Sequence, residues 1–213
     1  MRLVLALALV AAAPAGGQPA DRFPHNDVTR QLKSPTGNIE ASIRALQSTL
    51  TELQQLQLQT KQAHWNVSGT LFYPLHLLLQ EHYEGLSKYA DECAERLLAI
   101  GASSDGRATT IIRTSLIPEY PGGFTDDAAV IKWFSAVYLT ADRVTQQGIK
   151  ATNDSDPTTS NLLQEIDHAL AKYQWQMRAH LQETATDANR GADIGAPAAP
   201  APPPAGPAGF AKP

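Results

Sequence analysis

Residues Asn38 to Asn66, NIEASIRALQSTLTELQQLQLQTKQAHWN, decide the fold class of this chain. The stretch contains neither proline nor glycine, so nothing in it interrupts a helix. Its apolar side chains recur in alternating steps of four and three residues, which places them on one helical face. They are Ile39, Ile43, Leu46, Leu50 and Leu53. The same face turns polar toward His64, and Ser68-Gly69 ends the predicted helix.

Three further segments carry helical periodicity, over about residues 73–100, 126–150 and 156–181. Either Thr125 or Asp126 is suited to cap the third helix, and Asp156 followed by Pro157 is a strong start signal for the fourth. The chain shows no strand-like alternation. We therefore predict an all-α protein built as a four-helix bundle.

The connection between the second and third predicted helices, residues 101–124, is much longer than the other two. Short links favour antiparallel neighbours, whereas a link of this length can cross the whole bundle. Within it, Thr109 to Ser115 can form a short extra helix. The predicted bundle domain spans residues 38–183.

Composition narrows the class of protein. Hydrophobic residues make up 43 % of the chain and charged residues 18 %, which indicates a packed core. The net charge of −4 argues against strong binding of the whole domain to nucleic acid. The single cysteine, Cys93, excludes an internal disulfide framework and a Cys-rich metal site. No apolar run approaches the ~18 residues that a membrane span needs.

The two ends differ from the bundle. Residues 1–20 combine a basic start, an apolar stretch and small residues, the pattern of a signal peptide. We therefore expect export, most simply to a periplasm, with a cytoplasmic protein as the alternative if the segment is not a working signal. Residues 21–37 are polar and irregular, and the Ala/Pro-rich residues 184–213 are predicted to form a disordered tail.

Two acids and two histidines could carry chemistry. Asp91 and Glu95 are spaced i, i+4 on the second predicted helix, so their carboxylates share a face. Such a pair either binds a cation or is a solvated face paired with Lys88 and Arg96. His64 and His76 flank the turn between the first two helices, and together with carboxylates they would suit a divalent metal such as iron.

The positions of these residues constrain any shared site. His76 precedes Asp91 by 15 residues on one predicted helix, which is about 22 Å at 1.5 Å per residue. One chain cannot bring both to one metal. If they share a site, it forms between two subunits, most simply in an antiparallel twofold dimer.

Several motifs closely resemble those of the Dps family of ferritin-like proteins. They are Lys61-Gln62-Ala63-His64-Trp65-Asn66, then His76, Asp91-Glu92-Cys93-Ala94-Glu95-Arg96, Pro118-Glu119-Tyr120-Pro121 and Arg178-Ala179-His180. The resemblance covers about residues 38–183 and neither end of the chain. It implies a ferritin-like bundle, a shell of twelve subunits, and a ferroxidase that oxidises Fe(II) with hydrogen peroxide and stores ferric mineral against oxidative stress.

The resemblance also implies a site. His64 and His76 of one chain and Asp91 and Glu95 of its partner would bind iron, and Trp65 would donate electrons to stray oxidants. Where the family often has an acid, this chain has Gln80, a weaker ligand for a hard cation. The alternatives are therefore a structural or DNA-associated cage without effective ferroxidase activity, and a secreted helical module whose tail binds an envelope partner. The few cations of the tails make DNA binding the less expected property.

Overall fold

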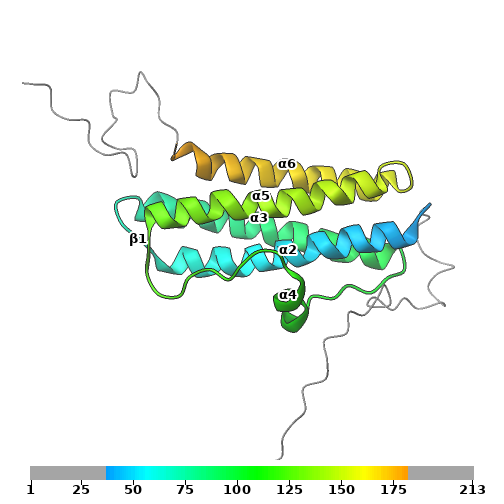
Figure 1. Ribbon diagram of the computed structural model, residues 1–213, viewed down its shortest axis with the longest axis horizontal. Coiled ribbons are helices and arrows are strands. Elements are labelled where there is room, and N and C mark those ends of the chain that lie inside the picture. Colours follow the sequence, from blue (N-terminus) through cyan, green and yellow to red (C-terminus); the bar gives the residue numbers. More distant parts are fainter. Residues whose placement is uncertain (1–36, 182–213) are drawn as a thin grey trace, which may run out of the picture.

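The computed structural model describes residues 37–181, and its helices confirm the predicted four-helix bundle (Figure 1). The long helices are α2 (Ile39–Asn66), α3 (Phe72–Ala99), α5 (Asp127–Thr152) and α6 (Pro157–Ala179), and the short α4 (Ala108–Thr114) lies in the long connection. The helix ends differ from the predicted ones by at most two residues. The predicted signal peptide (residues 1–20) and Ala/Pro-rich tail (184–213), and nearly all of the N-terminal segment 21–37, lie outside the described residues.

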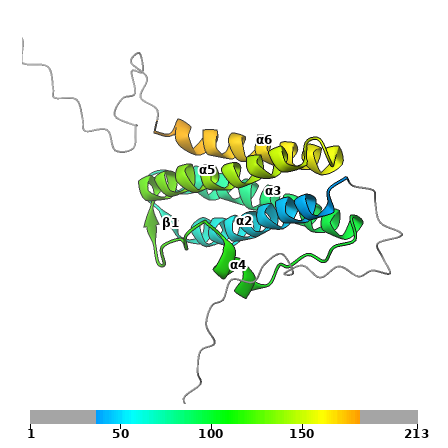
Figure 2. The same ribbon diagram turned by 45° about the vertical axis from the view of Figure 1, so that its right-hand side comes forward.

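Two helical hairpins form the bundle. α2 and α3 run antiparallel, as do α5 and α6, and the hairpins pack chiefly through α2 and α5 (Figures 1 and 2). The connection between α3 and α5, the crossover, runs along the bundle past α4, so that α3 and α5 begin at the same end. This is the topology that the long connection between the second and third predicted helices indicated.

The predicted apolar stripes form most of the core. Leu46 and Leu53 of α2, Leu79 and Leu86 of α3, and Phe134 of α5 are completely or almost completely buried. Val144 of α5 and Leu162 of α6, two other apolar residues of these helices, are only half buried. Within residues 37–181, none of the helices is both long and apolar enough to cross a membrane.

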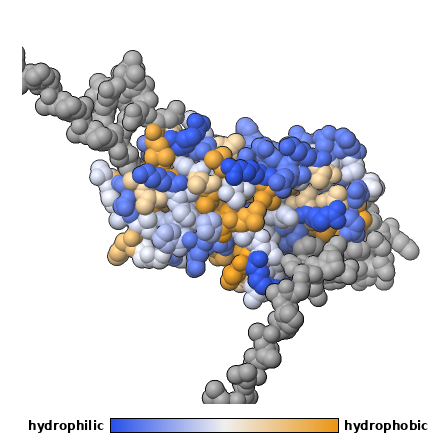
Figure 3. Space-filling view, in the orientation of Figure 1, coloured by the Kyte–Doolittle hydropathy of each residue, from blue (hydrophilic) through white to orange (hydrophobic). Residues whose placement is uncertain are grey.

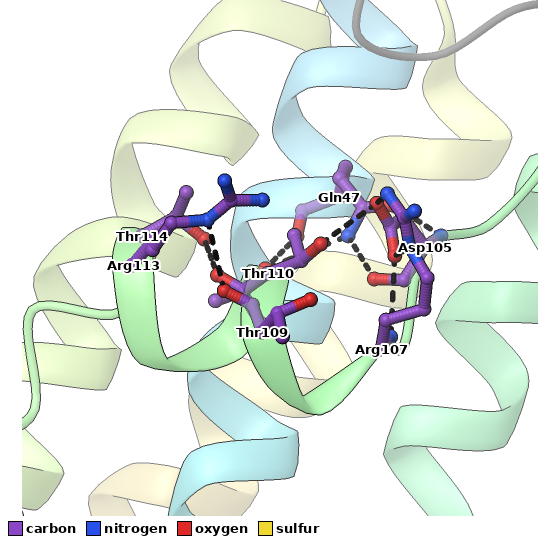
Figure 4. A network of polar contacts seen from close by, with 8 residues as sticks. Gln47, Asp105, Arg107, Thr109, Thr110, Arg113 and Thr114 are labelled. Atoms are coloured by element: carbon purple, nitrogen blue, oxygen red, sulfur yellow. Dashed lines mark hydrogen bonds and ion pairs between the residues drawn. The ribbon is translucent and has the colours of Figure 1, made fainter. Parts of the chain in front are cut away.

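Polar side chains of α2 fix the route of the crossover. Gln47 forms two hydrogen bonds with the backbone of Asp105: its Nε2 donates to the carbonyl at 2.8 Å, and its Oε1 accepts from the amide at 2.9 Å (Figure 4). The buried Glu52 carboxylate accepts from Ser115 Oγ at 2.7 Å and from Leu116 N at 2.9 Å. Each bond satisfies a backbone or hydroxyl group that the irregular connection would otherwise leave unpaired.

The crossover ends in a parallel strand pair that the sequence did not predict. β1 (Val67–Ser68) pairs with β2 (Thr125–Asp126), with Val67 opposite Thr125. Two-residue strands are too short to show any alternation of hydrophobicity, so periodicity could not find them. The pair joins the end of α2 to the start of α5.

Three of the long helices begin at a side-chain cap, and the sequence predicted the caps of α5 and α6. The Asn38 side chain accepts from Ala41 N at 3.1 Å, and the Asp126 side chain accepts from Ala129 N at 3.0 Å. The structure thus selects Asp126 over Thr125. Asp156 caps α6 by accepting from Thr159 N at 3.2 Å, with Pro157 following as predicted.

One titratable group lies in the middle of the core. His82 of α3 is fully buried, and burial lowers the pKa of its imidazole from 6.5 to about 4. Its ring nitrogens contact the Tyr138 hydroxyl at 2.8 Å and the Gln176 side-chain oxygen at 2.9 Å. The folded bundle therefore holds His82 neutral at pH values where the unfolded chain protonates it.

We expect acid to destabilise the bundle through His82. Its contribution is complete above pH 6.5 and is lost as the pH falls toward 4, because only the unfolded chain binds the proton in that window. The loss amounts to about 3 kcal/mol of unfolding free energy. Denaturant unfolding of wild type and His82→Phe at several pH values in this range gives the unfolding free energy of each. The loss is the difference between the two proteins in the slope of that free energy against pH.

The two proteins must be compared because Asp142 has the opposite effect on the stability of the bundle at low pH. Burial and a hydrogen bond with Asp167 raise the pKa of Asp142 to about 6, which favours the folded state as the pH falls. That contribution is the same in both proteins. Exchange of the exposed His168 for phenylalanine should leave the slope unchanged; a His82→Phe slope equal to that of wild type would contradict the expectation.

Candidate metal centre

A tight turn brings the C-terminal end of α2 to the N-terminal end of α3. Gly69 has a φ of +109°, which favours glycine, and a Cβ at this position would lie 2.6 Å from Asp127 Oδ2. The same Asp127 oxygen accepts a hydrogen bond from Leu71 N at 2.9 Å. The first residue of α5 therefore holds the turn that positions the two histidines.

His64 and His76 lie face to face across this turn. Their ring centroids are 3.8 Å apart and their planes are inclined by 20°. His64 Nδ1 lies 2.8 Å from the carbonyl oxygen of His76, and His76 Nδ1 lies 2.8 Å from the carbonyl oxygen of His64. The carbonyl of His64 belongs to the last turn of α2, where helix geometry supplies no partner of its own. Each imidazole is thus fixed by the backbone of the other residue.

These contacts determine which ring nitrogens are free. A carbonyl oxygen can only accept, so Nδ1 of each ring carries the proton and donates it. In the neutral imidazole the lone pair is then on Nε2, the atom available to a metal. Burial, together with the nearby His76 and Lys61, lowers the pKa of His64 and favours the neutral form. The pair is therefore prepared to bind a cation.

A cation of the protein itself lies beside the histidines. Lys61, one turn before His64, donates from Nζ to Gln80 Oε1 and lies 4.7 Å over the ring of Tyr83. Gln80 Nε2 in turn donates to Glu84 Oε1 at 2.6 Å. The position where the family often has an acid thus carries an amide, which is held by two charged neighbours. The spacing of Lys61 and His64, which share a face of α2, is the signal in the sequence that would have pointed to this lysine.

Gln80→Asp is expected to tighten the binding of Zn(II), a redox-inert probe, roughly tenfold, because a carboxylate replaces a neutral amide. Lys61 offsets part of the added charge, which limits the gain. Isothermal titration calorimetry of the assembled protein measures the change. Gln147→Asp, at an exposed position of α5, adds the same charge elsewhere and should have no effect; equal affinities for the wild type and Gln80→Asp would refute the argument.

Asp91 and Glu95 lie on the exposed face of α3, one turn apart. Neither carboxylate forms a hydrogen bond or ion pair with another residue of the described part of the chain. The interpretation in which Lys88 and Arg96 neutralise them is wrong. Lys88 pairs with Glu92 at 3.4 Å, and Arg96 pairs with Asp156 at 2.8 Å. The two acids therefore repel each other without a compensating cation.

The structure does not bring the histidines and the acids together in one chain. His76 and Asp91 lie on the same unbroken helix, α3, so helix rise alone separates them by about 22 Å. Over residues 37–181, no three side chains of the metal-binding types His, Cys, Asp and Glu are grouped closely enough for one ion. The candidate site in one chain is thus two separate halves.

Three other residues with reactive or ionisable side chains lie outside the two halves of the candidate site. Trp65 follows His64 directly in α2, and its side chain is 63 % exposed on the surface. Cys93 is buried in the core, and burial raises the pKa of its thiol to about 12. Glu165, which lies three residues before His168 in a Glu-x-x-His sequence, is exposed and contacts Tyr89 and Lys88.

Large apolar side chains are exposed along the crossover. Ile112 and Leu116 are 76 % and 68 % exposed, and Leu58 of α2 is 56 % exposed. In Figure 3 hydrophobic surface appears between polar regions on the face that the crossover follows. Large exposed apolar side chains of this kind favour contact with another chain.

The fold and sequence match known proteins. A family model described as a ferritin-like domain matches residues 43–186, which defines the class of protein. The chain is 58 % identical over 175 residues to the DNA protection during starvation protein 2 of Deinococcus radiodurans, covering 82 % of this chain and 73 % of that protein. The crystal structure of Dps92 from Deinococcus radiodurans is 62 % identical, with a TM-score of 0.70 over 74 % of this chain and 95 % of the other.

A more distant relative agrees. Dps from Microbacterium arborescens, solved in its high iron form, is 30 % identical and has a TM-score of 0.67 over 71 % of this chain and 99 % of the other. The chain therefore belongs to the Dps family of ferritin-like proteins, as its motifs indicated.

Proposed function

We propose that this protein is a ferroxidase that stores iron: it oxidises Fe(II) with hydrogen peroxide and retains the ferric product in a hollow shell of twelve subunits, against oxidative stress. The observation that carries the proposal is the stacked pair His64 and His76, whose Nδ1–H groups are both held by backbone carbonyls. That arrangement leaves the Nε2 atom of each ring as a ligand for a divalent ion.

The acids complete the site from a second subunit. Asp91 and Glu95, exposed and unpaired within the described chain, supply the negative charge that stabilises Fe(III) over Fe(II). Because helix rise keeps them about 22 Å from His76, they act on the imidazoles of a twofold-related neighbour. The exposed apolar residues of α4 and the crossover are suited to be covered in such an assembly.

The chemistry balances without a resident cofactor. Each Fe(II) bound at the shared site gives up one electron, and a peroxide accepts two electrons from two ions as its O–O bond breaks into two hydroxide ions. Bound Fe(III) acidifies its water ligands, which promotes hydrolysis to a mineral. Trp65, which is exposed and next to His64 in the sequence, donates an electron to an oxidant that escapes this reaction.

The acids provide the direct test. The double variant Asp91→Asn with Glu95→Gln is expected to assemble normally and to oxidise Fe(II) at least about a hundredfold more slowly, because removal of a partner outside the ligand shell already costs ten- to hundredfold. Stopped-flow absorbance of Fe(II) mixed with peroxide measures the rate. Glu92→Gln, on the same helix but paired with Lys88, is the control. An unchanged rate in the double variant would reject the enzymatic role.

The second candidate function is a cage that binds DNA without effective ferroxidase activity. The arrangement that favours it is Gln80 held by Lys61 and Glu84, so a neutral amide stands where the family often has an acid. The relative named for DNA protection during starvation gives it a context. Normal assembly with no iron uptake, together with retardation of DNA in a gel at low salt, would favour this candidate.

Export is proposed from residues 1–20 alone. Fractionation of cells that make the full chain should place it in the periplasm in a shortened form. Deletion of residues 2–20 should retain it in the cytoplasm; full-length protein in the cytoplasm of cells with the intact chain would favour the cytoplasmic alternative.

A further inference from the structure

The centre of the bundle contains four polar side chains that the proposed iron site does not use. His82 of α3 lies between Tyr138 of α5 and Tyr173 and Gln176 of α6. Its ring is edge-on to Tyr138, with centroids 5.5 Å apart at 80°, and is 4.3 Å from the ring of Tyr173. Gly85 allows Tyr173 to approach, since a Cβ there would lie 2.0 Å from its hydroxyl oxygen.

The hydrogen bonds of this cluster have a fixed direction. The amide oxygen of Gln176 can only accept, so His82 Nε2 carries the proton and donates it over 2.9 Å. The Nδ1 lone pair of His82 is then the acceptor for the Tyr138 hydroxyl at 2.8 Å. Burial raises the pKa of Tyr138 and lowers that of His82, so the resting pair is a neutral phenol bonded to a neutral imidazole.

The bundle does not need these bonds to satisfy its backbone. Both bonds of His82 join one side chain to another, and each of the three helices already has its own backbone ladder. Apolar side chains of similar volume would fill the same space without the cost of burying polar groups. A directed phenol-to-imidazole bond is instead what one-electron oxidation of a tyrosine requires, since the phenol must release its proton as the electron leaves.

Aromatic rings connect the cluster to the edge of the bundle. Tyr138 lies 5.6 Å from Phe134, which lies 4.8 Å from the half-buried Trp133. Tyr120, at the end of the crossover, is 5.0 Å from Trp133. An oxidising equivalent that reaches Trp133 therefore has a continuous row of ring contacts to Tyr138, and Tyr138 is the first member of the row with a base to take its proton.

We propose that Tyr138 and His82 form an internal electron donor that discharges one-electron oxidants. The inference rests on the proposed function for its oxidant, the hydroxyl radical that forms when one Fe(II) reduces peroxide by a single electron. The radical takes an electron from Trp133 and a proton from solvent, giving water and a tryptophan radical cation. Tyr138 then returns the electron to Trp133 and passes its proton to His82, which leaves a tyrosyl radical next to an imidazolium ion. A further Fe(II) reduces the tyrosyl radical, and the proton returns to its oxygen.

An iron-free experiment separates this inference from the ferroxidase proposal. Illumination of assembled protein with a ruthenium tris-bipyridine dye and persulfate oxidises tyrosine without metal at the protein. Electron paramagnetic resonance of the frozen sample should show one ordered tyrosyl radical coupled to a proton that exchanges in D2O. Tyr138→Phe should lose that signal, and Tyr89→Phe, which removes an exposed hydroxyl beside Glu165, should keep it.

Two further measurements test whether the radical is hydrogen-bonded to His82. His82→Leu retains Tyr138 but removes its proton acceptor, so the coupling to the exchangeable proton should disappear and the radical yield should fall. In the wild type, 15N-labelled histidine should alter the hyperfine pattern, which tests the bond without any substitution. An equal signal in Tyr138→Phe, or no histidine coupling in the wild type, would overturn the proposal.

A separate experiment tests whether the tyrosyl radical forms during iron oxidation. After Fe(II) and peroxide are mixed, rapid freezing should trap the same radical in the wild type and not in Tyr138→Phe. Normal iron oxidation without that radical would overturn the link. Failure of iron oxidation itself would count against the ferroxidase proposal, while the iron-free experiment would still decide the role of Tyr138.

Discussion

Shells assembled from two inactive chains are expected to regain about one quarter of the wild-type ferroxidase activity. One chain carries His64→Gln and His76→Gln, and the other carries Asp91→Asn and Glu95→Gln. If every site takes imidazoles from one subunit and acids from its twofold partner, equal mixing makes half of the dimers mixed, and each mixed dimer has one intact site of two. Recovered activity would therefore show that two subunits share each site, whereas loss of activity in a single variant shows only that its residues are needed.

The experiment has sharp controls. Shells of either chain alone should be inactive, and shells mixed only after assembly should stay so, because their subunits do not exchange partners. Stopped-flow oxidation of Fe(II) by peroxide gives the rate, and native mass spectrometry gives the mixing ratio. No activity in well-mixed shells would show that all the ligands must come from one chain, and the shared site would be abandoned.

Asp156→Ala is expected to destabilise the protein by about 3–5 kcal/mol, the cost of removing one partner of a buried ion pair. The Asp156 side chain is 2 % exposed and that of Arg96 11 % exposed, and their atoms are 2.8 Å apart. Asp156 also accepts from Ser42 Oγ at 2.8 Å and from Thr159 Oγ1 at 2.6 Å. Burial alone would raise the pKa of Asp156, but these hydrogen bonds and Arg96 outweigh it and lower the pKa.

Denaturant unfolding at neutral pH measures the loss. Asp156→Asn keeps an oxygen for the cap of α6 but removes the charge, so it should be destabilised by less than the alanine variant. Asp154→Ala, in the same loop but exposed, should change the free energy of unfolding by no more than about 0.5 kcal/mol. A loss below about 1 kcal/mol for Asp156→Ala would contradict the importance given to this pair.

Much of the fold could be predicted because its signals are local. The apolar steps through Leu46, Leu50 and Leu53 require only helix periodicity, and Asp156-Pro157 marks a helix start by chemistry that acts within one turn. The separation of His76 from Asp91 likewise follows from helix rise alone. The route of the crossover depends on which side chains of α2 meet its backbone, as Gln47 meets Asp105, and no local pattern encodes such a contact.

The sequence suggested which residues form the candidate site, but it did not predict the contacts of the residues around them. His64, His76, Asp91 and Glu95 could be named from spacing and resemblance, but the partner of Arg96 could not. That arginine follows Glu95 directly and bonds to Asp156, 60 residues away in the sequence. Charges adjacent in sequence point in different directions around a helix, so proximity along the chain misassigned its role.

The mutual anchoring of His64 and His76 affects the protein before it assembles. Both imidazoles are fixed by a turn within one chain, so this half of the proposed centre is ready as soon as α2 and α3 have folded. In the proposed site the acids would come from a neighbour. A newly made subunit would thus carry only half of the machinery for reducing peroxide. Reactive iron chemistry would begin only when a closed container exists to receive its product.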